Sequence, residues 1–498
     1  MDKLYIGIDF GNSTNFVTKY DFVRKDAVAV ANMGSYAGSD IFDNVIYIEG
    51  DGKYILGKRN RMDDTLNFFD DVKRHITSDN QKWRVPNLGD RQVTASDIAE
   101  MIFTGIREKV EATHGGKKID GAVITVPYAY GDKYRKRIKK SAENAGIPVI
   151  KLVEEPVAAA ISFGVFGDEI ENGKKENIVV FDFGGGTFDL TIFKFEKDDK
   201  QHAKIEVLNT GGVEKLGGKN IDAKIVNKFL EQDLKISLSD IQVEKEQKIL
   251  KRELLKEARE NKELLSEEDE VEIYKGGLSI NNESKVIDRE LSRDEFEDWL
   301  RTANIVGEIE DALDIAIADA DLDPSDIDRV ILAGGSSSIP IIKDIVRDFF
   351  GFEPEARKNL GELVGHGAGI LAGLSVDDSL KYTVIRKTSK SVGVAIGNRF
   401  QKILRKNSPY GEISPEYKLR IGNSNLKEDF ILSFYEGESG QIDECEKIGK
   451  ATIDGTVFPS NTIFLSLYRD DDSGEIGYIF YDENKNEVLR GEFEEIEQ

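Results

Sequence analysis

Two hairpin-like segments with one shared pattern restrict the fold of this chain more than any other feature. Residues 5–18 read YIGIDFGNSTNFVT, and residues 178–191 read IVVFDFGGGTFDLT. One ungapped register aligns Asp9 with Asp182, Phe10 with Phe183, Gly11 with Gly184, and Thr14 with Thr187. An apolar run, an Asp-Phe-Gly turn and a second strand-like run predict a β-hairpin each time. Because each hairpin opens a long α/β stretch, the repeat indicates a duplicated lobe.

Strands and helices alternate between and after the two hairpins. Apolar runs predict strands over 121–127, 149–156 and 329–335. A glycine loop that leads into a helix is expected over 211–234. Further helices are expected over 132–146, 156–164, 243–265, 292–320, 339–351 and 361–373. This order is typical of an α/β domain.

The pattern changes near residue 375, where the helical periodicity stops. Short segments such as SVGVAIG, DFILSFYEGE and EIGYIFYD follow, separated by Gly, Asn, Asp and Pro. They predict an antiparallel β-domain. We therefore expect an α/β domain over 1–374, a linker over 375–390 and a β-sandwich over 391–498.

Composition excludes several classes of function. The 498 residues carry a formal net charge of −25, and an acidic surface repels phosphate backbones, so nucleic-acid binding is not expected. Cys445 is the single cysteine, which excludes an intrachain disulfide, and the four histidines lie too far apart for a zinc site. The start MDKLYIGIDFG predicts a strand and not a signal peptide, and no apolar stretch is long enough for a membrane span. We expect a soluble, cytoplasmic protein.

The two Asp-Phe-Gly turns combine the groups that a metal-bound phosphate needs. Glycine lets backbone N–H groups approach a phosphate closely. A carboxylate at each strand end, Asp9 and Asp182, can hold Mg²⁺ directly or through water. Either hairpin alone is more simply explained as an ordinary tight turn. The pair in shared register favours a clamp on a triphosphate, because phosphoryl transfer depends mostly on positioning and charge stabilisation.

Two further segments have a functional and a purely structural explanation. RVILAGGSSSIP predicts a strand, a Gly-Gly turn and a helix start, which suits either a nucleoside or a plain strand-to-helix connection. Glu154 and Glu155 end a strand before a helix, where a carboxylate can orient water or simply favour the helix dipole. No G-x-x-x-x-G-K-[ST] P-loop occurs, and GHGAG lacks the preceding strand of a dinucleotide-binding fingerprint.

Several motifs resemble those of the 70-kDa heat-shock (DnaK-type) chaperones, within the superfamily of actin and hexokinase: FDFGGGTFDLTI, VEEPVAAAISFG, VPYAYGDKYRKRIKKSAENAGI and ILAGGSSSIP. The similarity runs over nearly the whole chain, and SVGVAIG and ILRKNSPYG resemble the family's substrate-binding sandwich. The resemblance implies an actin-like ATPase domain of two ribonuclease H-like lobes over 1–374, followed by an antiparallel β-sandwich. It also implies ATP or ADP and Mg²⁺ as cofactors, with K⁺ as an additional ion.

The resemblance implies a catalytic role for each matching residue. Asp9 and Asp182 would hold the Mg²⁺ shell, and Lys73 in DVKRHI would orient the attacking water and the phosphate. Glu155, together with Asp182, would position the water, and Thr187 would reach the γ-phosphate. The residues of the two turns would cradle the phosphates: Gly11, Asn12, Ser13, Gly184, Gly185 and Gly186.

Other residues match family positions on the nucleoside side or between the domains. Lys262 and Ser266 match adenosine-side positions, and Pro127 and Arg135 match residues linked to signalling between domains. Ribose and adenine contacts are implied for Gly217, Gly218, Gly334, Gly335 and Ser336.

The chain departs from the family pattern at several places. Asn12 and Ser13 replace threonines, and Thr14 stands where a tyrosine is common, which affects the first turn and any K⁺ site. The linker reads DDSLKYTVIRK without the leucine-rich acidic motif, so the coupling of ATP to substrate stays open. The segment after His75 is short, and no helical lid follows the β-domain. Three residues near the adenine differ and predict weaker adenine affinity or selectivity: Arg259, Glu263 and Gly361.

The β-domain is expected to bind extended peptide by strand addition and an apolar pocket. Without a lid, we expect bound peptide to leave quickly. The candidate contacts, each of which is also explained as sandwich core, are Val394, Ile396, Ile421, Phe430 and Leu432.

The sequence thus predicts an ATP-hydrolysing, chaperone-like protein that binds unfolded polypeptide under nucleotide control. The resemblance implies a J-domain co-chaperone and a nucleotide exchange factor as partners, and a monomeric state. Three alternatives remain: an ATP-binding regulator or scaffold with weak turnover, a small-molecule kinase of the same superfamily, and an actin-like polymer. Phosphate transfer to a sugar would indicate a kinase, and ATP-dependent light scattering would indicate a filament.

Overall fold

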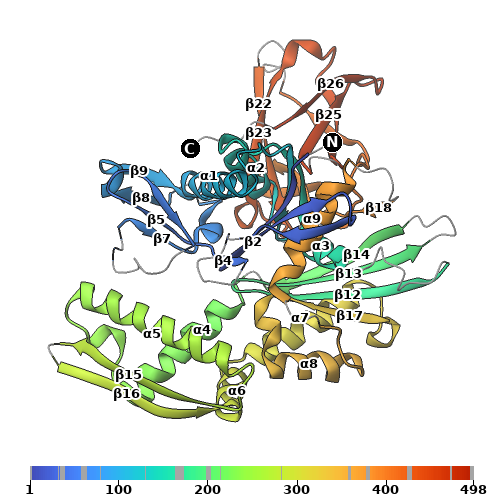
Figure 1. Ribbon diagram of the computed structural model, residues 1–498. Coiled ribbons are helices and arrows are strands. Elements are labelled where there is room, and N and C mark those ends of the chain that lie inside the picture. Colours follow the sequence, from blue (N-terminus) through green and yellow to red (C-terminus); the bar gives the residue numbers. More distant parts are fainter. Residues whose placement is uncertain are drawn as a thin grey trace.

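The computed structural model in Figure 1 describes most of the chain. The described residues are 3–31, 33, 40–57, 64, 66–78, 80–128, 130–162, 173–197, 203–213, 215–281, 283–356, 360–376, 382–422, 429–471 and 474–493. Within these ranges no helix is both long enough and apolar enough to cross a membrane.

The first large sheet is built around the first hairpin. Its strands run in the order β11-β10-β1-β2-β3, with β4 also paired to β2. The strands β1, β10 and β11 are parallel, whereas β1, β2 and β3 are antiparallel. The bounds are β1 Tyr5–Phe10, β2 Thr14–Asp21, β3 Asp26–Ala29, β4 Ile41–Asp43, β10 Gly121–Val126 and β11 Val149–Glu154.

The second large sheet repeats this pairing scheme around the second hairpin. Its order is β17-β12-β13-β14-β18, and β12 is antiparallel to β13 but parallel to β17. The bounds are β12 Lys175–Phe183, β13 Phe188–Lys197, β14 Ala203–Val213, β17 Arg329–Ala333 and β18 Tyr382–Ile385. In both sheets the antiparallel hairpin therefore lies beside a parallel strand, and the Asp-Phe dipeptide ends the first strand of the hairpin.

Helices cover the outer faces of the sheets and fill the space between them (Figure 1). The helices α1 (Ala95–Thr113) and α2 (Asp132–Asn144) bury their apolar faces against the first sheet. Between the sheets, α3 (Glu155–Ala160) contacts β11 and β12, and α9 (Leu363–Leu374) contacts β1 and β2. A side chain added at Gly7 on β1 would collide with the backbone of Gly369 on α9, and one added at Gly369 would collide with Thr18 and Ala27. The small residues of 361–373 thus serve close helix packing.

The second sheet is covered on its outer side by α7 (Ile305–Asp319), next to which α8 (Pro340–Phe350) packs. The expectation of one helix over 292–320 is wrong, because α6 (Arg293–Thr302) and α7 are separate. Asn304 between them has φ 61°, a left-handed conformation that interrupts a right-handed helix and that asparagine tolerates. Ser292 begins α6 by accepting a hydrogen bond from the Glu295 N–H at 3.2 Å.

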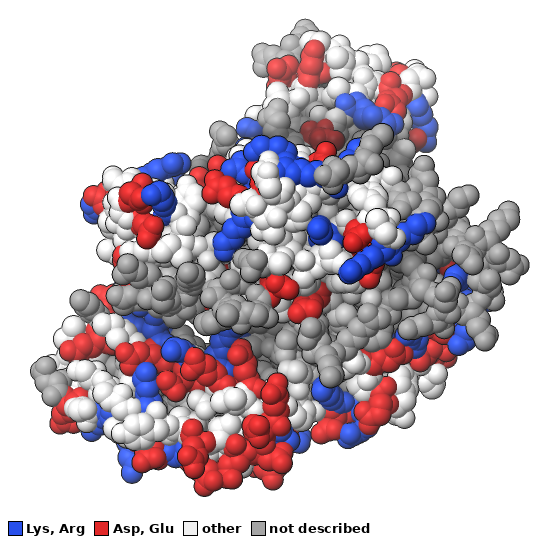
Figure 2. Space-filling model, in the orientation of Figure 1, with Lys and Arg blue, Asp and Glu red and all other residues white. Residues whose placement is uncertain are grey.

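Smaller units extend from each large sheet. The first large sheet carries the strands β5 Ile46–Ile48, β6 Tyr54–Leu56 and β7 Phe68–Phe69 and the 3₁₀ turns η1 Val72–His75 and η2 Pro86–Leu88. It also carries the strand pair β8 Lys82–Val85 and β9 Arg91–Thr94. The second carries α4 Gly218–Lys228, the π-helical turn η4 Phe229–Leu234, α5 Glu244–Leu264 and the hairpin β15 Glu270–Ile280 with β16 Glu283–Ser292. Figure 2 shows acidic side chains gathered over the unit of α5, β15, β16 and α6, so part of the net negative charge is concentrated there.

Residues 391–492 form two four-stranded antiparallel sheets around one apolar core. The first has the order β20-β19-β22-β23, and the second has the order β21-β24-β25-β26. The bounds are β19 Ser391–Ile396, β20 Arg399–Leu404, β21 Tyr417–Arg420, β22 Asp429–Gly437, β23 Glu446–Asp454, β24 Thr462–Arg469, β25 Ile476–Tyr481 and β26 Glu487–Glu492. We call this part the β-domain.

The segment expected to be a linker is partly ordered as a strand, because β18 adds to the edge of the second sheet beside β14. After it, Arg386 is 2% exposed and lies between Glu154 at the end of β11 (4.0 Å) and Asp471 of the β-domain (3.4 Å). Arg135 on α2 pairs with the same Glu154 at 3.0 Å. The Tyr410 hydroxyl donates to Glu154 at 3.4 Å, and the Tyr410 ring lies 4.6 Å below the Arg386 guanidinium. A buried charge network therefore joins the first sheet, the linker and the β-domain.

Replacing Glu154 tests this network. Burial raises the pKa of Glu154, but Arg135 and Arg386 outweigh it and lower the pKa overall, so the group is a carboxylate at neutral pH. Glu154→Gln would leave two buried guanidinium groups without their shared anion and is expected to lower the free energy of unfolding by about 3 kcal/mol. Urea unfolding followed by circular dichroism measures this. The matched control is Asp51→Asn at an exposed ion pair with Lys53, where no resolvable change is expected. Equal effects of the two variants would contradict the assignment.

Candidate active site

The two Asp-Phe-Gly turns meet face to face. We call residues 11–13 the first turn and residues 184–187 the second turn. A side chain added at Gly185 would collide with the Ser13 hydroxyl, and one added at Gly186 would lie 2.7 Å from the Asn12 side chain. The second turn is closed by the Gly184 N–H, which donates to the Thr187 carbonyl at 3.1 Å. Glycine at positions 185 and 186 is therefore required by the close approach of the turns.

Carboxylates converge at the base of these turns. Asp9 ends β1, Asp182 lies at the end of β12 and is 6% exposed, and Glu155 begins α3 and is 8% exposed. Lys73, which is 1% exposed, donates to Glu155 Oε1 at 2.5 Å. The structure thus brings together the four residues expected to hold the metal and the water, although they come from four separate segments of the chain.

The electrostatics of this cluster favour a bound cation. Burial raises the pKa of Asp9 to about 7, and repulsion from Glu155 adds to this, while Lys73 and the Thr125 hydroxyl (2.9 Å) act in the opposite direction. Burial raises the pKa of Asp182 as well, and so does repulsion from Glu155 and Asp189. Removing several carboxylates from water is costly unless positive charge compensates them.

These residues fit a Mg²⁺ ion that is shared with a ligand. Asp9 and Asp182 supply hard oxygen atoms, the donor type that Mg²⁺ prefers. Among the described residues, no group of three or more His, Cys, Asp or Glu side chains is arranged as a metal cage. A Mg²⁺ ion here would therefore take most of its ligands from water and phosphate oxygens, as is usual for this ion at phosphate-transfer sites.

The residues expected on the nucleoside side converge on the second turn. The Gly218 N–H donates to the Gly184 carbonyl at 3.0 Å, and the Ser336 hydroxyl donates to the same oxygen at 2.9 Å. A side chain at Gly217 would lie 2.6 Å from the Gly186 nitrogen. Lys262 on α5 donates to the Gly218 carbonyl at 3.2 Å and to Asp222 at 2.6 Å.

The remaining expected residues lie in or beside this site. Ser266 donates to the Lys262 carbonyl one helical turn earlier, at 3.2 Å. Gly334 has φ 77°, which lets β17 end directly against Asp182, and Gly335 opens the following 3₁₀ turn. The Gly11 carbonyl accepts from the Asn44 side chain at 2.6 Å.

Two of the residues expected to differ near the adenine, Arg259 and Glu263, take part in an ion-pair bridge between two separate units. Arg259 on α5 pairs with Asp43 on β4 at 3.2 Å and with Glu263 at 2.8 Å. Gly361 lies in the 3₁₀ turn η8 (Leu360–Glu362) just before α9, where an added side chain would be 3.4 Å from Ile41. The bridge therefore ties β4 to α5 beside the nucleoside side of the site.

Sequence reasoning missed several polar residues of the site. Asp189 on β13 is the register partner of Asp182 and is 4% exposed. In the repeat it matches Phe16, so the alignment of the two hairpins gives no signal for it. Arg74 donates to the Gly186 carbonyl at 2.5 Å, and Lys219 reaches the first turn from α4. Arg74 directly follows Lys73 in the sequence, and this adjacency could have identified Arg74 as a residue of the site.

The candidate peptide contacts differ in exposure. Val394 is fully buried in the β-domain core, whereas Ile396 is 46% exposed. Ile421, Phe430 and Leu432 are half-buried against the same core. In this structure Val394 contributes to packing, and the partly exposed residues are the ones that a peptide could contact.

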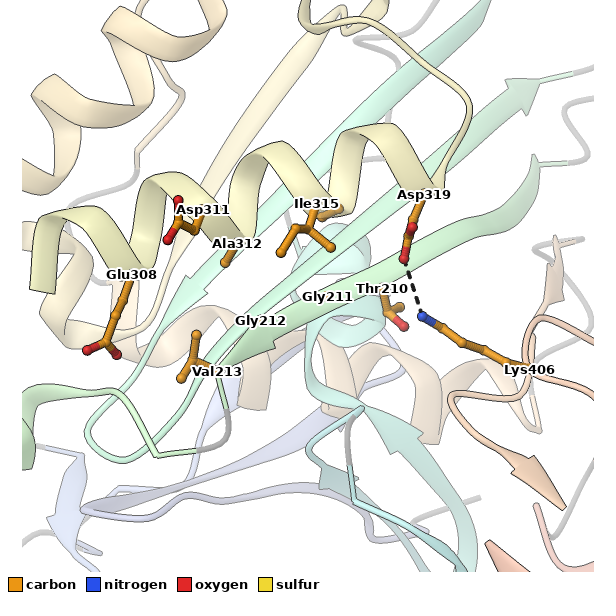
Figure 3. A pocket seen from close by; sticks show the side chains of 11 residues that line it. Thr210, Gly211, Gly212, Val213, Glu308, Asp311, Ala312, Ile315, Asp319 and Lys406 are labelled. Carbon is orange, nitrogen blue, oxygen red and sulfur yellow. Dashed lines mark ion pairs between the residues drawn. The ribbon is translucent and has the colours of Figure 1, made fainter. Parts of the chain in front are cut away.

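A separate cavity of about 330 Å³ lies between α7 and β14 (Figure 3). It is lined by Thr210–Val213, by Glu308, Asp311, Ile315 and neighbouring residues of α7, and by Lys406. Lys406 follows β20 and pairs with Asp319 at 3.6 Å (Figure 3). The Lys406–Asp319 pair is therefore a second place where the β-domain contacts the preceding α/β part of the chain, here at α7.

Comparison with known proteins gives a consistent result over most of the chain. A family model described as Hsp70 protein matches residues 31–461. The chaperone protein DnaK of Trichormus variabilis is 30% identical over 429 residues, which cover 81% of this chain and 59% of that protein. The chaperone protein dnaK1 of Nostoc sp. is 29% identical over 429 residues with the same coverage. The chain thus spans about 59% of the length of these relatives.

Adding one methyl group tests the packing of the second turn. At Gly334, with φ 77°, an added Cβ would lie 2.5 Å from Asp182 Oδ1 and from the Phe183 carbonyl. Gly334→Ala is therefore expected to lower the free energy of unfolding by roughly 2–4 kcal/mol, through backbone strain and overpacking. Gly335→Ala is the control, since no atom lies within 4 Å of an added Cβ there. Thermal unfolding compares the two, and equal midpoints would contradict the close approach.

Proposed function

The chain belongs to the Hsp70 protein family, and from this premise we propose that it is a Mg²⁺-dependent ATPase that acts as a molecular chaperone. Family members are ATPases that bind ATP or ADP with Mg²⁺. The single observation that carries the proposal is the buried Lys73–Glu155 pair at the point where Asp9 and Asp182 converge. We also infer that the two large sheets, with their repeated pairing scheme, are the two lobes of an actin-like fold that arose by duplication.

The proposed mechanism assigns each residue a task at the phosphates. The glycines of the second turn offer backbone N–H groups to the phosphate oxygens, and Thr187 lies beside them. Asp9 and Asp182 would hold Mg²⁺, which would neutralise charge on the phosphates when bound. Glu155 orients the attacking water and accepts its proton, and Lys73 pairs with Glu155 and presents positive charge to the γ-phosphate. The barrier falls mainly through positioning and charge stabilisation.

The nucleoside would lie against the second turn. Gly217, Gly218 and Ser336 approach this turn closely, and Lys262 is fixed there by Asp222. We propose that these residues contact ribose and adenine. The Arg259–Asp43 bridge stands beside them, so the base would bind against an ion pair whose polar groups are already partly satisfied.

The β-domain would bind unfolded or extended polypeptide. The relatives carry the name chaperone protein, and the chain spans only part of their length, so substrate and partners are proposals here. A peptide could add to a sheet edge and place a side chain against Ile396, Phe430 or Leu432. The proposal includes a J-domain co-chaperone and a nucleotide exchange factor as partners, and a cytoplasmic location. The contacts of Arg386 and Lys406 would couple the β-domain to conformational changes in the ATPase part.

Replacing Lys73 tests the ATPase proposal. Lys73→Ala is expected to slow ATP turnover about 100-fold, because it removes a preorganised positive charge and leaves Glu155 unpaired, while nucleotide binding persists. Turnover is measured with and without a reduced, alkylated polypeptide that stays unfolded. The exposed Lys82→Ala is the control and should behave as the wild type.

The outcomes separate the candidate functions. Polypeptide-stimulated turnover that disappears in Lys73→Ala would support a coupled chaperone cycle. Turnover that ignores the polypeptide would contradict the chaperone part and favour an ATP-binding regulator. Phosphate transfer to a sugar would favour a small-molecule kinase. Unchanged turnover in Lys73→Ala would contradict the proposed site itself.

Metal dependence tests the roles of the two aspartates. Chelation of Mg²⁺ by EDTA should abolish turnover, and Asp182→Asn should raise the Mg²⁺ concentration needed for half-maximal turnover about tenfold or more, because an amide is a weaker metal ligand than a carboxylate. The control is Asp321→Asn at an exposed, left-handed position that asparagine tolerates. An unchanged Mg²⁺ requirement in Asp182→Asn would contradict the metal assignment.

A further inference from the structure

Lys219 connects both turns of the proposed active site. It is the second residue of α4, and its backbone N–H donates to the Gly185 carbonyl of the second turn at 2.8 Å. Its side chain extends to the opposite side, where Nζ donates to the Asn12 carbonyl of the first turn at 3.0 Å and to Asp71 Oδ1 at 2.6 Å. One residue therefore holds three segments that approach the phosphates.

We propose that Lys219 is a positioning residue for ATP hydrolysis, which fixes the first turn and the segment bearing Lys73 relative to the second turn. The inference rests on the proposed function. The role of Lys219 is indirect, because its ammonium contacts a backbone carbonyl and Asp71. Lys73 and Glu155 remain the groups assigned to the reaction.

Asp71 transmits the position of Lys219 to Lys73. Asp71 has φ 58°, a left-handed conformation that turns the chain directly into η1, and Lys73 lies two residues further on. Its carboxylate lies between two cations, Lys219 at 2.6 Å and Arg74 at 3.8 Å. Arg74 in turn donates to the Gly186 carbonyl at 2.5 Å, so η1 is attached to the second turn twice, through Lys219 and through Arg74.

The charge and exposure of the contact suit alignment better than overall stability. The Lys219 and Asp71 side chains are 26% and 32% exposed, so the pair is partly hydrated. Partly exposed ion pairs add little to stability, and a variant at this position should still fold. Burial lowers the pKa of the Lys219 ammonium, and the Asp71 carboxylate opposes this shift.

The kinetic consequence follows from which contacts Lys219 fixes. The proposed nucleoside side is formed by Lys262, Ser336 and the glycines around them. The hydrogen bonds described for these residues do not involve the Lys219 side chain. The first turn and Lys73 act at the phosphate that is cleaved. Loss of the Lys219 side chain should therefore lower kcat more than it raises KM, because misalignment affects the transition state more than binding.

The test compares Lys219→Met, Lys219→Arg and the control Lys224→Met, an exposed lysine on the same helix. We expect kcat for ATP hydrolysis to fall about tenfold in Lys219→Met with KM changed less than threefold, and Lys219→Arg to recover most of the loss, since an arginine can keep both contacts. The kcat of Asp71→Asn should fall by a similar factor. Adding Asp71→Asn to Lys219→Met should lower kcat little further, because both changes break the same contact. A kcat in Lys219→Met within twofold of the wild type would overturn the proposal.

Hydrogen exchange makes the test independent of turnover. Amides of residues 72–76 should exchange several-fold faster in Lys219→Met than in the wild type and in Lys224→Met, because η1 loses one of its attachments. If the wild type hydrolyses no ATP, the proposed function fails, and the exchange result alone decides the role of Lys219. Unchanged exchange in 72–76 would then overturn the positioning role.

Discussion

At the centre of the molecule, the ion pair between Lys73 and Glu155 compensates part of the negative charge of a cluster of buried carboxylates. Asp9, Glu155, Asp182 and Asp189 arrive from four segments, and burial together with repulsion from neighbouring carboxylates raises the pKa of Asp9 and of Asp182. Such a cluster is unfavourable without nearby positive charge. Lys73 supplies part of that charge from η1, and the Asp71, Arg74 and Lys219 contacts determine where η1 lies. The position of a peripheral turn is thereby linked to the electrostatics of the buried site.

The end of β11 joins this site to the rest of the protein. Glu155 contacts Lys73, whereas its neighbour Glu154 contacts Arg135, Arg386 and Tyr410. Two adjacent carboxylates thus face the proposed active site and the β-domain from one strand end. Because both are buried and both are held by cations, a shift of the strand end would disturb both sets of contacts together.

Much of the fold and the centre of the site could be predicted from the sequence, because they depend on local patterns. Glycine turns, apolar strands and the Asp-Phe-Gly repeat locate β1, β2, β12 and β13 and the aspartates at their ends. Contacts made by long polar side chains across the fold leave no such pattern. Lys219 looks like any lysine at the start of a helix, and its contact with Asn12 spans 207 positions. The break at Asn304 was missed because the apolar period continues through it, and β18 was missed because an edge strand in a linker needs a partner that the sequence does not show.

The contact between the β-domain and the first sheet is specific but not strongly stabilising. Arg386, Glu154, Arg469 and Glu436 are all at most 2% exposed, and buried ion pairs often only offset the cost of removing their charges from water. Glu436 pairs with Arg469 at 3.1 Å yet also faces the buried Asp132, and burial raises the pKa of Glu436, with Asp132 adding to the rise. An apolar interface of this size would bind more firmly but would fix the two parts less selectively. An interface built on charged groups holds one arrangement while leaving little free energy to overcome when the parts separate, and this property would suit the proposed coupling between the β-domain and the ATPase part.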